Sequence, residues 1–311
     1  MQIDRFRAMN SDIVLVAEGA PSQVHSGFVA VHEFIEASEK RFTRFSEQSE
    51  LSQLNRAAGS WFRSSPDFFE VMKEALYCFH KTHGLFDPSV LPSLWNAGYV
   101  HSLDEIRRTG STPPSASPLQ ASTSTFASVE LNETDSAIRL PADMQIDLGG
   151  IAKGWIAERA AHVLRRYASA CAVNAGGDMF LSGYPDGQDS WEVGLEDPRD
   201  PDVDISILYV QEGAIATSSV LKRAWKQGER SRHHLIDPRT GEPASTSWLS
   251  VTVLAPRAAV AETFAKAFLI ADEEETPLLG EQNPDLTALA VDKNGNLVSL
   301  VKSGEGLHVS R

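Results

Sequence analysis

The sequence has few cysteines, a deficit of basic residues and no long apolar run. Its two cysteines, Cys78 and Cys171, are far apart in apolar stretches of the 311-residue chain, so we expect buried free thiols rather than a disulfide. No apolar run approaches the ~18 residues that a transmembrane helix needs, so we expect no membrane span. The 28 basic residues against 42 acidic ones give a net charge of −14. Phosphate backbones repel so acidic a chain, which makes nucleic acid an unfavourable partner.

The beginning of the chain lacks a targeting pattern. Residues 1–19 contain one short apolar patch, IVLVA, with acidic residues on both sides. A secretory signal needs a longer apolar stretch after basic residues, and lipid attachment needs a cysteine. We therefore expect a cytoplasmic protein, or a periplasmic one if a leader has been removed.

The overall composition is that of a globular protein. Hydrophobic residues make up 42% of the chain and charged residues 23%. A chain of this length buries roughly three quarters of its unfolded surface, so it needs neither a disulfide nor a metal to hold a core. We expect one domain over residues 1–311. Residues 109–128 are rich in Ser, Thr and Pro and predict a variable surface loop within it.

Hydrophobic spacing predicts both helices and strands. Ser65 and Pro66 form a helix start, and Gly84 marks the stop of that helix. The expected helices cover about 23–42, 66–84, 151–167 and 259–271. The expected strands are 12–17, 137–140, 144–147, 171–174, 191–195, 205–210, 249–254, 287–291 and 297–301. Long β runs mixed with helices in no strict alternation predict an α+β fold.

The most informative segment is Asp147-Leu-Gly-Gly-Ile-Ala-Lys-Gly154. Two glycines between a strand-like segment and a helix let a ligand approach backbone amides, and the start of the helix favours an anion. Lys153 adds a positive charge, and Asp147 adds a carboxylate. The alternative is a tight turn with a surface lysine, because the segment matches neither the Walker A pattern nor the dinucleotide fingerprint.

Three further segments combine turns with reactive side chains. Asn174-Ala-Gly-Gly-Asp178 suits a scaffolding turn. In His233-His234-Leu-Ile-Asp-Pro-Arg-Thr-Gly241, His234 is a candidate proton acceptor for a hydroxyl, although a lone histidine is more often structural, and His233 is the weaker candidate. In Gly84-Leu-Phe-Asp-Pro-Ser-Val90, the apolar residues suit a core, or Phe86 and Asp87 line a flat aromatic ligand.

Together and in this order, the segments resemble the FAD:protein FMN transferase family, also called the ApbE family. The resemblance spans nearly the whole chain. Its motifs are Phe6-Arg-Ala-Met9, Ser49-Glu-Leu-Ser-Gln-Leu-Asn55, GLFDPSV with Leu94-Trp95, DLGGIAKG, NAGGD with Trp191-Glu-Val-Gly194 and Asp197-Pro198, Ala216-Thr-Ser218, and HLIDPRTG.

The resemblance implies a fold, a substrate and a reaction. The implied fold is an ApbE-like α+β fold with mixed β-sheets flanked by helices. The implied activity splits FAD and transfers FMN to a Ser or Thr hydroxyl of a partner flavoprotein, with release of AMP. Such phosphoryl transfer depends on positioning and on neutralising charge at the phosphates. Two alternatives stay open: a homologue that binds flavin nucleotides with little or no transfer, and an FAD pyrophosphatase.

The resemblance also implies roles for single residues. By this resemblance, His234 matches the base that deprotonates the acceptor hydroxyl, Lys153 would meet the pyrophosphate, and Asp147 would orient the ligand. These three are the candidate catalytic residues. The positions that match FAD contacts are Met9, Phe45, Leu85, Phe86, Asp87, Asp147, Lys153 and Leu235. Phe45 stands where the family commonly has Tyr, which keeps an aromatic ring but loses a hydroxyl.

The implied magnesium site departs from the family. Its matching positions are Gly150, through a backbone oxygen, Glu262 and Ala265. Glu262 replaces an Asp, and Lys266 replaces a Thr four residues later that would also bind the metal; an ammonium cannot be a ligand, so the Mg²⁺ site is in doubt. Two interpretations follow. Either Glu262 and Lys266 are an exposed helical ion pair, or the charge of Lys266 takes the place of the metal beside the pyrophosphate, so that binding survives while turnover falls.

Overall fold

The computed structural model describes residues 1–109, 112, 119–120, 122–301 and 308–310. The chain forms two compact units. The first contains Met1–Ser38, Lys153–Leu221 and Thr246–Arg311, and the second contains Glu39–Ala152 and Lys222–Ser245. We expected one domain over residues 1–311, and that expectation stays a prediction. Positions 110–111, 113–118 and 121 of the expected surface loop lie outside the described residues.

The first unit is built on an eight-stranded sheet with the order β1-β2-β6-β7-β10-β15-β16-β17. Each neighbouring pair in this sheet is antiparallel. The alternating sequence of β2 buries every second side chain, as a strand with one covered face should. The strands are β1 (Gln2–Ala8), β2 (Ser11–Glu18), β6 (Ala170–Ala175), β7 (Asp178–Ser182), β10 (Gly213–Ser219), β15 (Trp248–Ala255), β16 (Thr287–Asp292) and β17 (Leu297–Val301).

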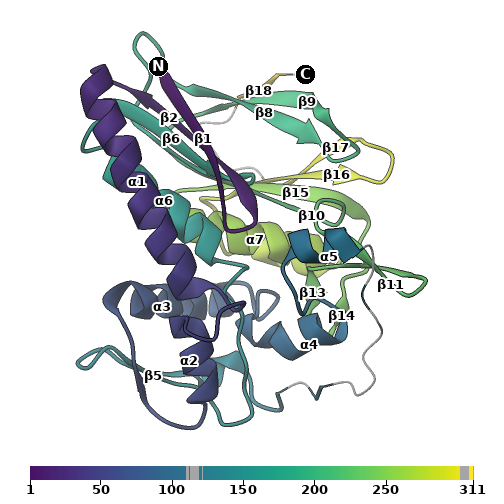
Figure 1. Ribbon diagram of the computed structural model, residues 1–311. Coiled ribbons are helices and arrows are strands. Elements are labelled where there is room, and N and C mark those ends of the chain that lie inside the picture. The colour runs from purple at the N-terminus through teal and green to yellow at the C-terminus, as the bar shows by residue number, and fades with distance from the viewer. Residues whose placement is uncertain (110–111, 113–118, 121, 302–307, 311) are drawn as a thin grey trace. The chain divides into compact units, whose positions relative to one another are not determined.

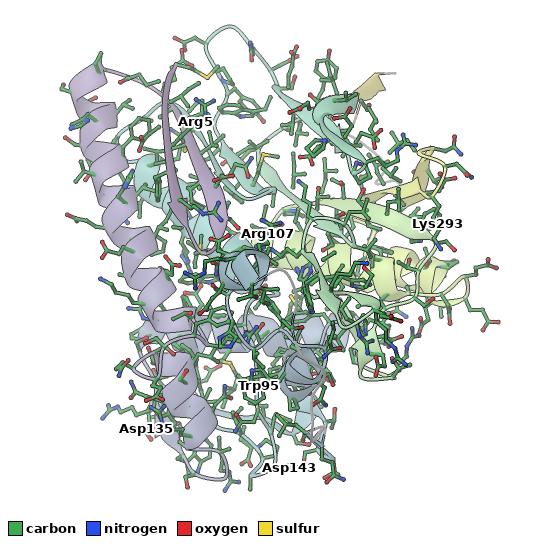
Figure 2. The ribbon with its side chains drawn as sticks, turned by 45° about the vertical axis from the view of Figure 1, so that its right-hand side comes forward. Arg5, Trp95, Arg107, Asp135, Asp143 and Lys293 are labelled. Atoms are coloured by element: carbon green, nitrogen blue, oxygen red, sulfur yellow. The ribbon has the colours of Figure 1, made fainter. Side chains whose placement is uncertain are left out.

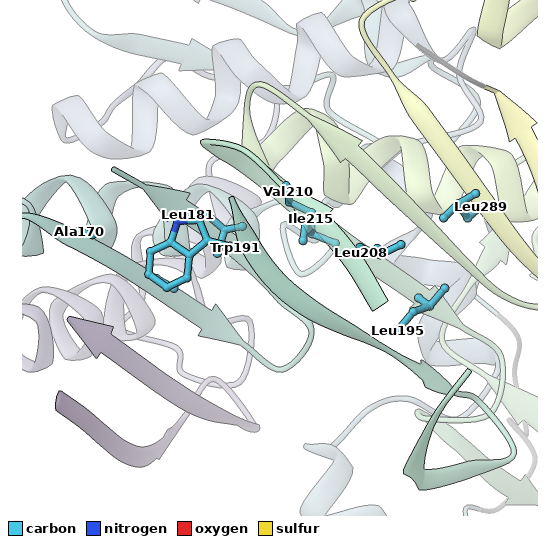
Figure 3. Packing of buried hydrophobic residues seen from close by; sticks show 9 residues of the cluster. Ala170, Leu181, Trp191, Leu195, Leu208, Val210, Ile215 and Leu289 are labelled. Atoms are coloured by element: carbon cyan, nitrogen blue, oxygen red, sulfur yellow. The ribbon is translucent and has the colours of Figure 1, made fainter. Parts of the chain in front are cut away.

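A smaller sheet completes the β-structure of this unit. It consists of β8 (Trp191–Asp197), β9 (Asp200–Val210) and β18 (His308–Ser310) in the order β18-β9-β8. Its apolar side chains pack with those of β6, β7, β10 and β16 in one cluster (Figure 3), so the small sheet covers part of the large one. The cluster contains Ala170, Ala172, Leu181, Trp191, Leu195, Leu208, Val210, Ile215 and Leu289.

Helix α7 (Ala258–Ile270) packs against β10 and β15 (Figure 1). Its sequence is apolar on nearly every side, and nearly all of its residues are buried, as expected of a helix inside a core. The unit also contains α6 (Ala152–Leu164), whose first residue belongs to the second unit, and α8 (Glu275–Glu281). Helix α1 (Pro21–Phe42) begins in the first unit and ends in the second.

The second unit is mainly helical. Ser49 caps α2 and Ser65 caps α3, each by accepting a hydrogen bond from a backbone N–H three residues later. The helices are α2 (Glu50–Arg56), α3 (Pro66–Lys81), α4 (Leu91–Asn96) and α5 (Leu103–Thr109), with 3-10 turns η1 (Pro88–Val90) and η2 (Phe126–Ser128). The strands are β3 (Phe62–Arg63), β4 (Glu130–Asn132), β5 (Ala137–Arg139), β11 (Ala224–Gln227), β12 (Arg230–His233), β13 (Ile236–Asp237) and β14 (Glu242–Pro243).

One carboxylate organises the described end of the expected surface loop. Asp143, labelled in Figure 2, accepts hydrogen bonds from the hydroxyls of Ser122, Thr123 and Ser124 and from the Thr123 backbone N–H. These bonds hold the pKa of Asp143 well below its usual range. Residues 122–124 are therefore ordered by one side chain rather than by a core.

The α+β class is confirmed. The sheets were expected to be mixed, but the pairings between the described strands are antiparallel. A parallel contact occurs only as an isolated bridge between the described residues Thr112 and Gln227, outside the strands. The strand expected at 144–147 is wrong: the segment joins no strand ladder. Cys78 and Cys171 are buried and are not joined in a disulfide, as expected. Among the residues that the structure describes, no helix combines the length and apolar character needed to cross a bilayer.

Candidate functional site

Four charged side chains of the first unit form a cluster that we call the ionic tetrad: Lys153, Asp178, Glu262 and Lys266. Lys153 lies in the first turn of α6, Asp178 begins β7, and the other two lie one turn apart in α7. The Lys153 ammonium contacts Asp178 and lies 2.7 Å from Glu262 Oε1. The Lys266 ammonium lies 3.1 Å from that same oxygen. The charges therefore alternate in sign and cancel.

The tetrad is buried. Glu262 is 0% exposed, and the Lys153 and Lys266 side chains are each 13% exposed. The second oxygen of Glu262, Oε2, accepts a hydrogen bond of 2.8 Å from the Gly154 backbone N–H. The interpretation of Glu262 and Lys266 as an exposed helical pair is therefore wrong, because the apolar surroundings of α7 bury both residues.

Gly154 allows this contact. A Cβ atom at position 154 would lie 2.5 Å from the Ala258 carbonyl oxygen of α7, which is too close for any side chain. The absent side chain lets α6 and α7 approach until the Gly154 N–H reaches Glu262. The last glycine of the DLGGIAKG segment therefore serves helix packing.

The protonation of the tetrad follows from burial opposed by close charges. Burial alone would raise the pKa of Glu262, but the Lys153 and Lys266 ammonium groups and the hydrogen bonds outweigh it and lower the pKa to about 2. Burial lowers the pKa of Lys266, with Glu262 opposing. Burial likewise raises the pKa of Asp178, with Lys153 opposing. The tetrad thus keeps Glu262 ionised between two ammonium groups.

The residues present do not fit magnesium. Both oxygens of Glu262 already accept hydrogen bonds from N–H donors, and Lys266 places an ammonium where a ligand oxygen would be needed. Ala265 lies in the buried interior of α7 and has no ligand side chain, and Gly150 lies in the turn before α6. Within the described part of the chain, no three His, Cys, Asp or Glu side chains gather as a metal site.

Met9 lies in the hairpin between β1 and β2. Met9 and Asn10 have φ angles of 54° and 53°, as a two-residue type I′ turn requires. Asn tolerates this conformation, whereas Met seldom adopts it. Gly176 of the NAGGD segment packs beside the hairpin, where a Cβ would lie 2.7 Å from Ser11 Oγ. That segment is thus a scaffolding turn, and its Asp178 also joins the ionic tetrad.

In the second unit, Asp147 is fixed at three atoms. Its backbone N–H donates to the Pro88 carbonyl at 2.8 Å, and Oδ2 accepts from the Gly149 N–H at 3.1 Å. Oδ1 lies 3.4 Å from Nε of Arg44. The Pro88 contact places the DLGG segment beside the GLFDPSV segment.

Asp87 caps η1 in the GLFDPSV segment. One oxygen, Oδ1, accepts hydrogen bonds of 2.7 Å from the backbone N–H and from the hydroxyl of Ser89. Burial raises the pKa of Asp87, although these bonds oppose it. Leu85 and Phe86 are 4% and 5% exposed, so their side chains mainly fill the core.

The two neighbouring histidines differ in their contacts. His233 ends β12, and its Nε2 lies 3.2 Å from the Ala244 carbonyl oxygen. Because a carbonyl oxygen only accepts hydrogen bonds, this nitrogen must carry the proton and donate the hydrogen bond. Burial lowers the pKa of His233. The His234 backbone N–H donates to the Arg223 carbonyl oxygen, and the Leu235 carbonyl oxygen accepts from the Ala244 backbone N–H. His233 is thus tied to the structure of the loop.

Phe45 is 42% exposed and lies directly after Arg44. Sequence reasoning missed Arg44, and it missed Asp178 as a partner of Lys153. A basic residue next to a candidate ligand ring was the available signal for Arg44. For Asp178 the signal was an acidic residue at the end of a glycine turn.

The architecture and the site define an α+β protein with a buried, electrically balanced charge cluster and an aspartate held by an arginine and by backbone groups. A sequence model of the ApbE family matches residues 9–290, and the chain belongs to that family. A protein of Treponema pallidum named FAD:protein FMN transferase is 28% identical over 293 residues, covering 87% of this chain and 78% of that protein. A Klebsiella pneumoniae protein of the same name is 26% identical over 276 residues, covering 86% and 83%.

Solved structures show the same fold. The ApbE protein of Thermotoga maritima superposes with a TM-score of 0.80 at 25% identity, with 96% of each chain covered. The flavin transferase ApbE of Vibrio cholerae superposes with a TM-score of 0.75 at 20% identity, covering 99% of this chain and 96% of that one. The expected ApbE-like fold is thereby confirmed.

Proposed function

We propose that the protein is an FAD:protein FMN transferase that moves FMN from FAD to a Ser or Thr hydroxyl of an acceptor flavoprotein. The observation that carries this proposal is the similarity over 87% of the chain to a curated transferase of that name. In the reaction, the hydroxyl oxygen bonds to the FMN phosphorus, and the bond from that phosphorus to the oxygen bridging to AMP breaks. The hydroxyl proton goes to the base, and AMP leaves with the bridging oxygen.

His234 is the proposed base, and Lys153 the proposed charge at the pyrophosphate. An ammonium held by Asp178 and Glu262 keeps a fixed position, and a fixed charge stabilises developing negative charge without reorganising. Asp147 is proposed to orient the flavin nucleotide. The remaining proposed FAD contacts are Met9, Phe45, Leu85, Phe86, Asp87 and Leu235.

The test of the function incubates the protein with FAD and an acceptor flavoprotein and measures covalent flavin fluorescence in a denaturing gel. We expect a fluorescent acceptor and release of AMP with the unaltered protein. His234→Gln should abolish transfer, whereas His233→Gln, which changes the neighbouring imidazole bound to Ala244, should retain it. Equal loss in both variants would contradict the assignment of His234, and AMP release without labelled acceptor would instead indicate FAD pyrophosphatase activity.

A second candidate function is flavin-nucleotide binding with little or no transfer. The unsuitability of Glu262 and Lys266 for Mg²⁺ favours it, because one ammonium supplies less charge than a dication and cannot bridge two phosphates. FAD binding without labelled acceptor and without AMP release would establish this alternative.

We also propose that Lys266 takes the place of the metal. Chelation with EDTA should then leave the FAD affinity of the unaltered protein unchanged, measured by flavin fluorescence. Lys266→Thr should make the affinity depend on Mg²⁺, whereas Lys293→Thr, at an exposed position labelled in Figure 2, should not. A loss of affinity on chelation of the unaltered protein would overturn this role.

A further inference from the structure

Arg44 contacts two aromatic rings of the second unit. Its guanidinium carbon is 4.3 Å from the centre of the Phe45 ring and 4.5 Å from the centre of the Tyr99 ring. Its side chain is only 5% exposed. A guanidinium over an aromatic face is attracted by the ring electrons, and more strongly where water is excluded. The two rings themselves meet edge to face, with their centres 6.2 Å apart, so Arg44 lies in the corner that they form and both rings fix its position.

The edge of the same guanidinium makes two polar contacts. One terminal nitrogen donates a 2.7 Å hydrogen bond to the Tyr99 carbonyl oxygen, and Nε lies 3.4 Å from Asp147 Oδ1. Asp147 Oδ2 accepts from Gly149. The two carboxylate oxygens are thus held from different sides, one by the backbone and one by Arg44.

The two rings differ in exposure. Tyr99 is 8% exposed and stacks on Trp225, with 5.1 Å between ring centres. The Trp225 indole N–H donates to the Ala97 carbonyl at 2.8 Å. The stacked rings of Tyr99 and Trp225 are thereby anchored in the core of the second unit. Phe45, whose ring meets Tyr99 edge to face, is 42% exposed and presents an aromatic surface supported by both Arg44 and Tyr99.

We propose that Arg44 is a positioning residue that holds the Phe45 ring and the Asp147 carboxylate in one prearranged surface for a flavin nucleotide. The exposed ring suits a flat heteroaromatic group, and the fixed carboxylate suits a hydroxyl or ring N–H of the same ligand. Arg44 touches both and is itself covered, so it acts through them. A surface that is already ordered loses less conformational freedom on binding, which strengthens affinity.

The chemistry of arginine is needed here. Its planar guanidinium can contact two rings while its several N–H groups meet a carbonyl and a carboxylate. Lysine can keep the charge near Asp147 but carries no planar group that makes all of these contacts at once. This inference rests on the proposed flavin ligand, and it assigns a role to a residue outside the proposed FAD contacts.

The experiment measures FAD affinity of the full chain by fluorescence titration for Arg44→Met, Arg44→Lys and Asp147→Asn. Arg41→Met is the matched control. Arg41 also lies beside a phenylalanine and pairs with carboxylates, at 2.6 Å from Asp67, but it contacts neither Phe45 nor Asp147 in any recorded interaction. We expect Arg44→Met to weaken FAD binding about tenfold and Arg41→Met to change it less than about twofold.

Two further results separate positioning from a general loss of structure. Combining Arg44→Met with Asp147→Asn should weaken binding little more than the stronger single change, because both act on one surface. Arg44→Lys, which keeps the charge, should stay folded by thermal melting and still lose affinity. Normal affinity in Arg44→Met, equal loss in Arg41→Met, or multiplied losses in the double variant would overturn the inference alone. Failure of the unaltered protein to bind FAD would overturn the proposed function as well.

Discussion

The ionic tetrad predicts a strong energetic coupling between Glu262 and Lys266. Glu262→Gln keeps the shape of the side chain but removes its charge, so that Lys153 and Lys266 share only Asp178 as a counter-charge. The buried cluster then carries an unbalanced positive charge. Removing one member of a buried ion pair costs about 3–5 kcal/mol, and Glu262 is fully buried, so we expect this cost in the free energy of unfolding.

The double variant Glu262→Gln with Lys266→Met should be much more stable than the single changes suggest. It leaves the Lys153–Asp178 pair balanced and replaces a buried ammonium by an apolar chain of similar length. Replacing a whole buried pair is often nearly neutral, so we expect a cost of about 0–2 kcal/mol and a coupling of at least about 2 kcal/mol. Urea unfolding of the full chain, followed by tryptophan fluorescence and circular dichroism, measures these differences.

An exposed pair in the same unit provides the control. Arg7 and Asp12 lie 3.2 Å apart with side chains 49% and 86% exposed. Arg7→Met should cost below about 1 kcal/mol, since solvent screens such pairs. Additive costs for Glu262 and Lys266, or a Glu262→Gln cost no larger than that of Arg7→Met, would refute the reasoning.

Three further predictions concern acid stability, Asn55 and Gly154. The folded pKa of Glu262, about 2, lies below its ordinary value of 4.5. The stabilisation by its charge is therefore complete above pH 4.5 and is lost as the pH falls through 2. Acid unfolding monitored by circular dichroism should accordingly be steeper in the unaltered protein than in Glu262→Gln. Asn55→Ala should cost about 2–4 kcal/mol in urea unfolding, since it leaves the Ile146 N–H and C=O without their partner, and a cost below about 1 kcal/mol would contradict this. Gly154→Ala should lower the melting temperature, because its Cβ would overlap a backbone oxygen of α7, and an unchanged melting temperature would contradict the close helix contact.

Segments with a local pattern could be predicted from the sequence. The cap at Ser65 and the proline after it marked the start of α3, which runs over Pro66–Lys81. Other elements carry no such pattern. Strand β1, which includes the Arg5 labelled in Figure 2, bears three charged residues at the edge of the sheet. Strand β10 is rich in small residues and is buried on both faces, so neither strand shows the alternation expected of a half-buried strand.

The segment 144–147 shows how a correct pattern led to a wrong element. Its residues alternate as in a strand, and their backbone does find hydrogen-bond partners. At Ile146 both partners belong to the side chain of Asn55, which donates to the Ile146 carbonyl and accepts from its N–H, each at 2.9 Å. A side chain 91 positions away thus replaces the neighbouring strand. No local pattern in residues 144–147 contains that information.

The candidate site, like the fold, could be predicted from the sequence only in part. The sequence placed Lys153, Glu262 and Lys266 among the important residues, but two interpretations of the helical pair stayed open. The structure decides between them because α7 is apolar on nearly every side, and that property was already visible in AAVAETFAKAFLI. For Arg44 the sequence offered only its position next to Phe45, because its proposed role depends on Tyr99 and Asp147, which lie far along the chain.

A lysine in place of a cation changes binding and catalysis unequally. The tetrad as a whole is neutral, so the attraction that we propose for a pyrophosphate must come from the orientation of two ammonium groups rather than from excess charge. We expect the Lys266 ammonium, which cannot bridge two phosphates as a dication can, to attract them before and during reaction to a similar degree. Interactions that are equal in the ground state and the transition state raise affinity without raising the turnover rate. The physical expectation for this chain is therefore firm FAD binding that does not need a metal, combined with slow transfer of FMN.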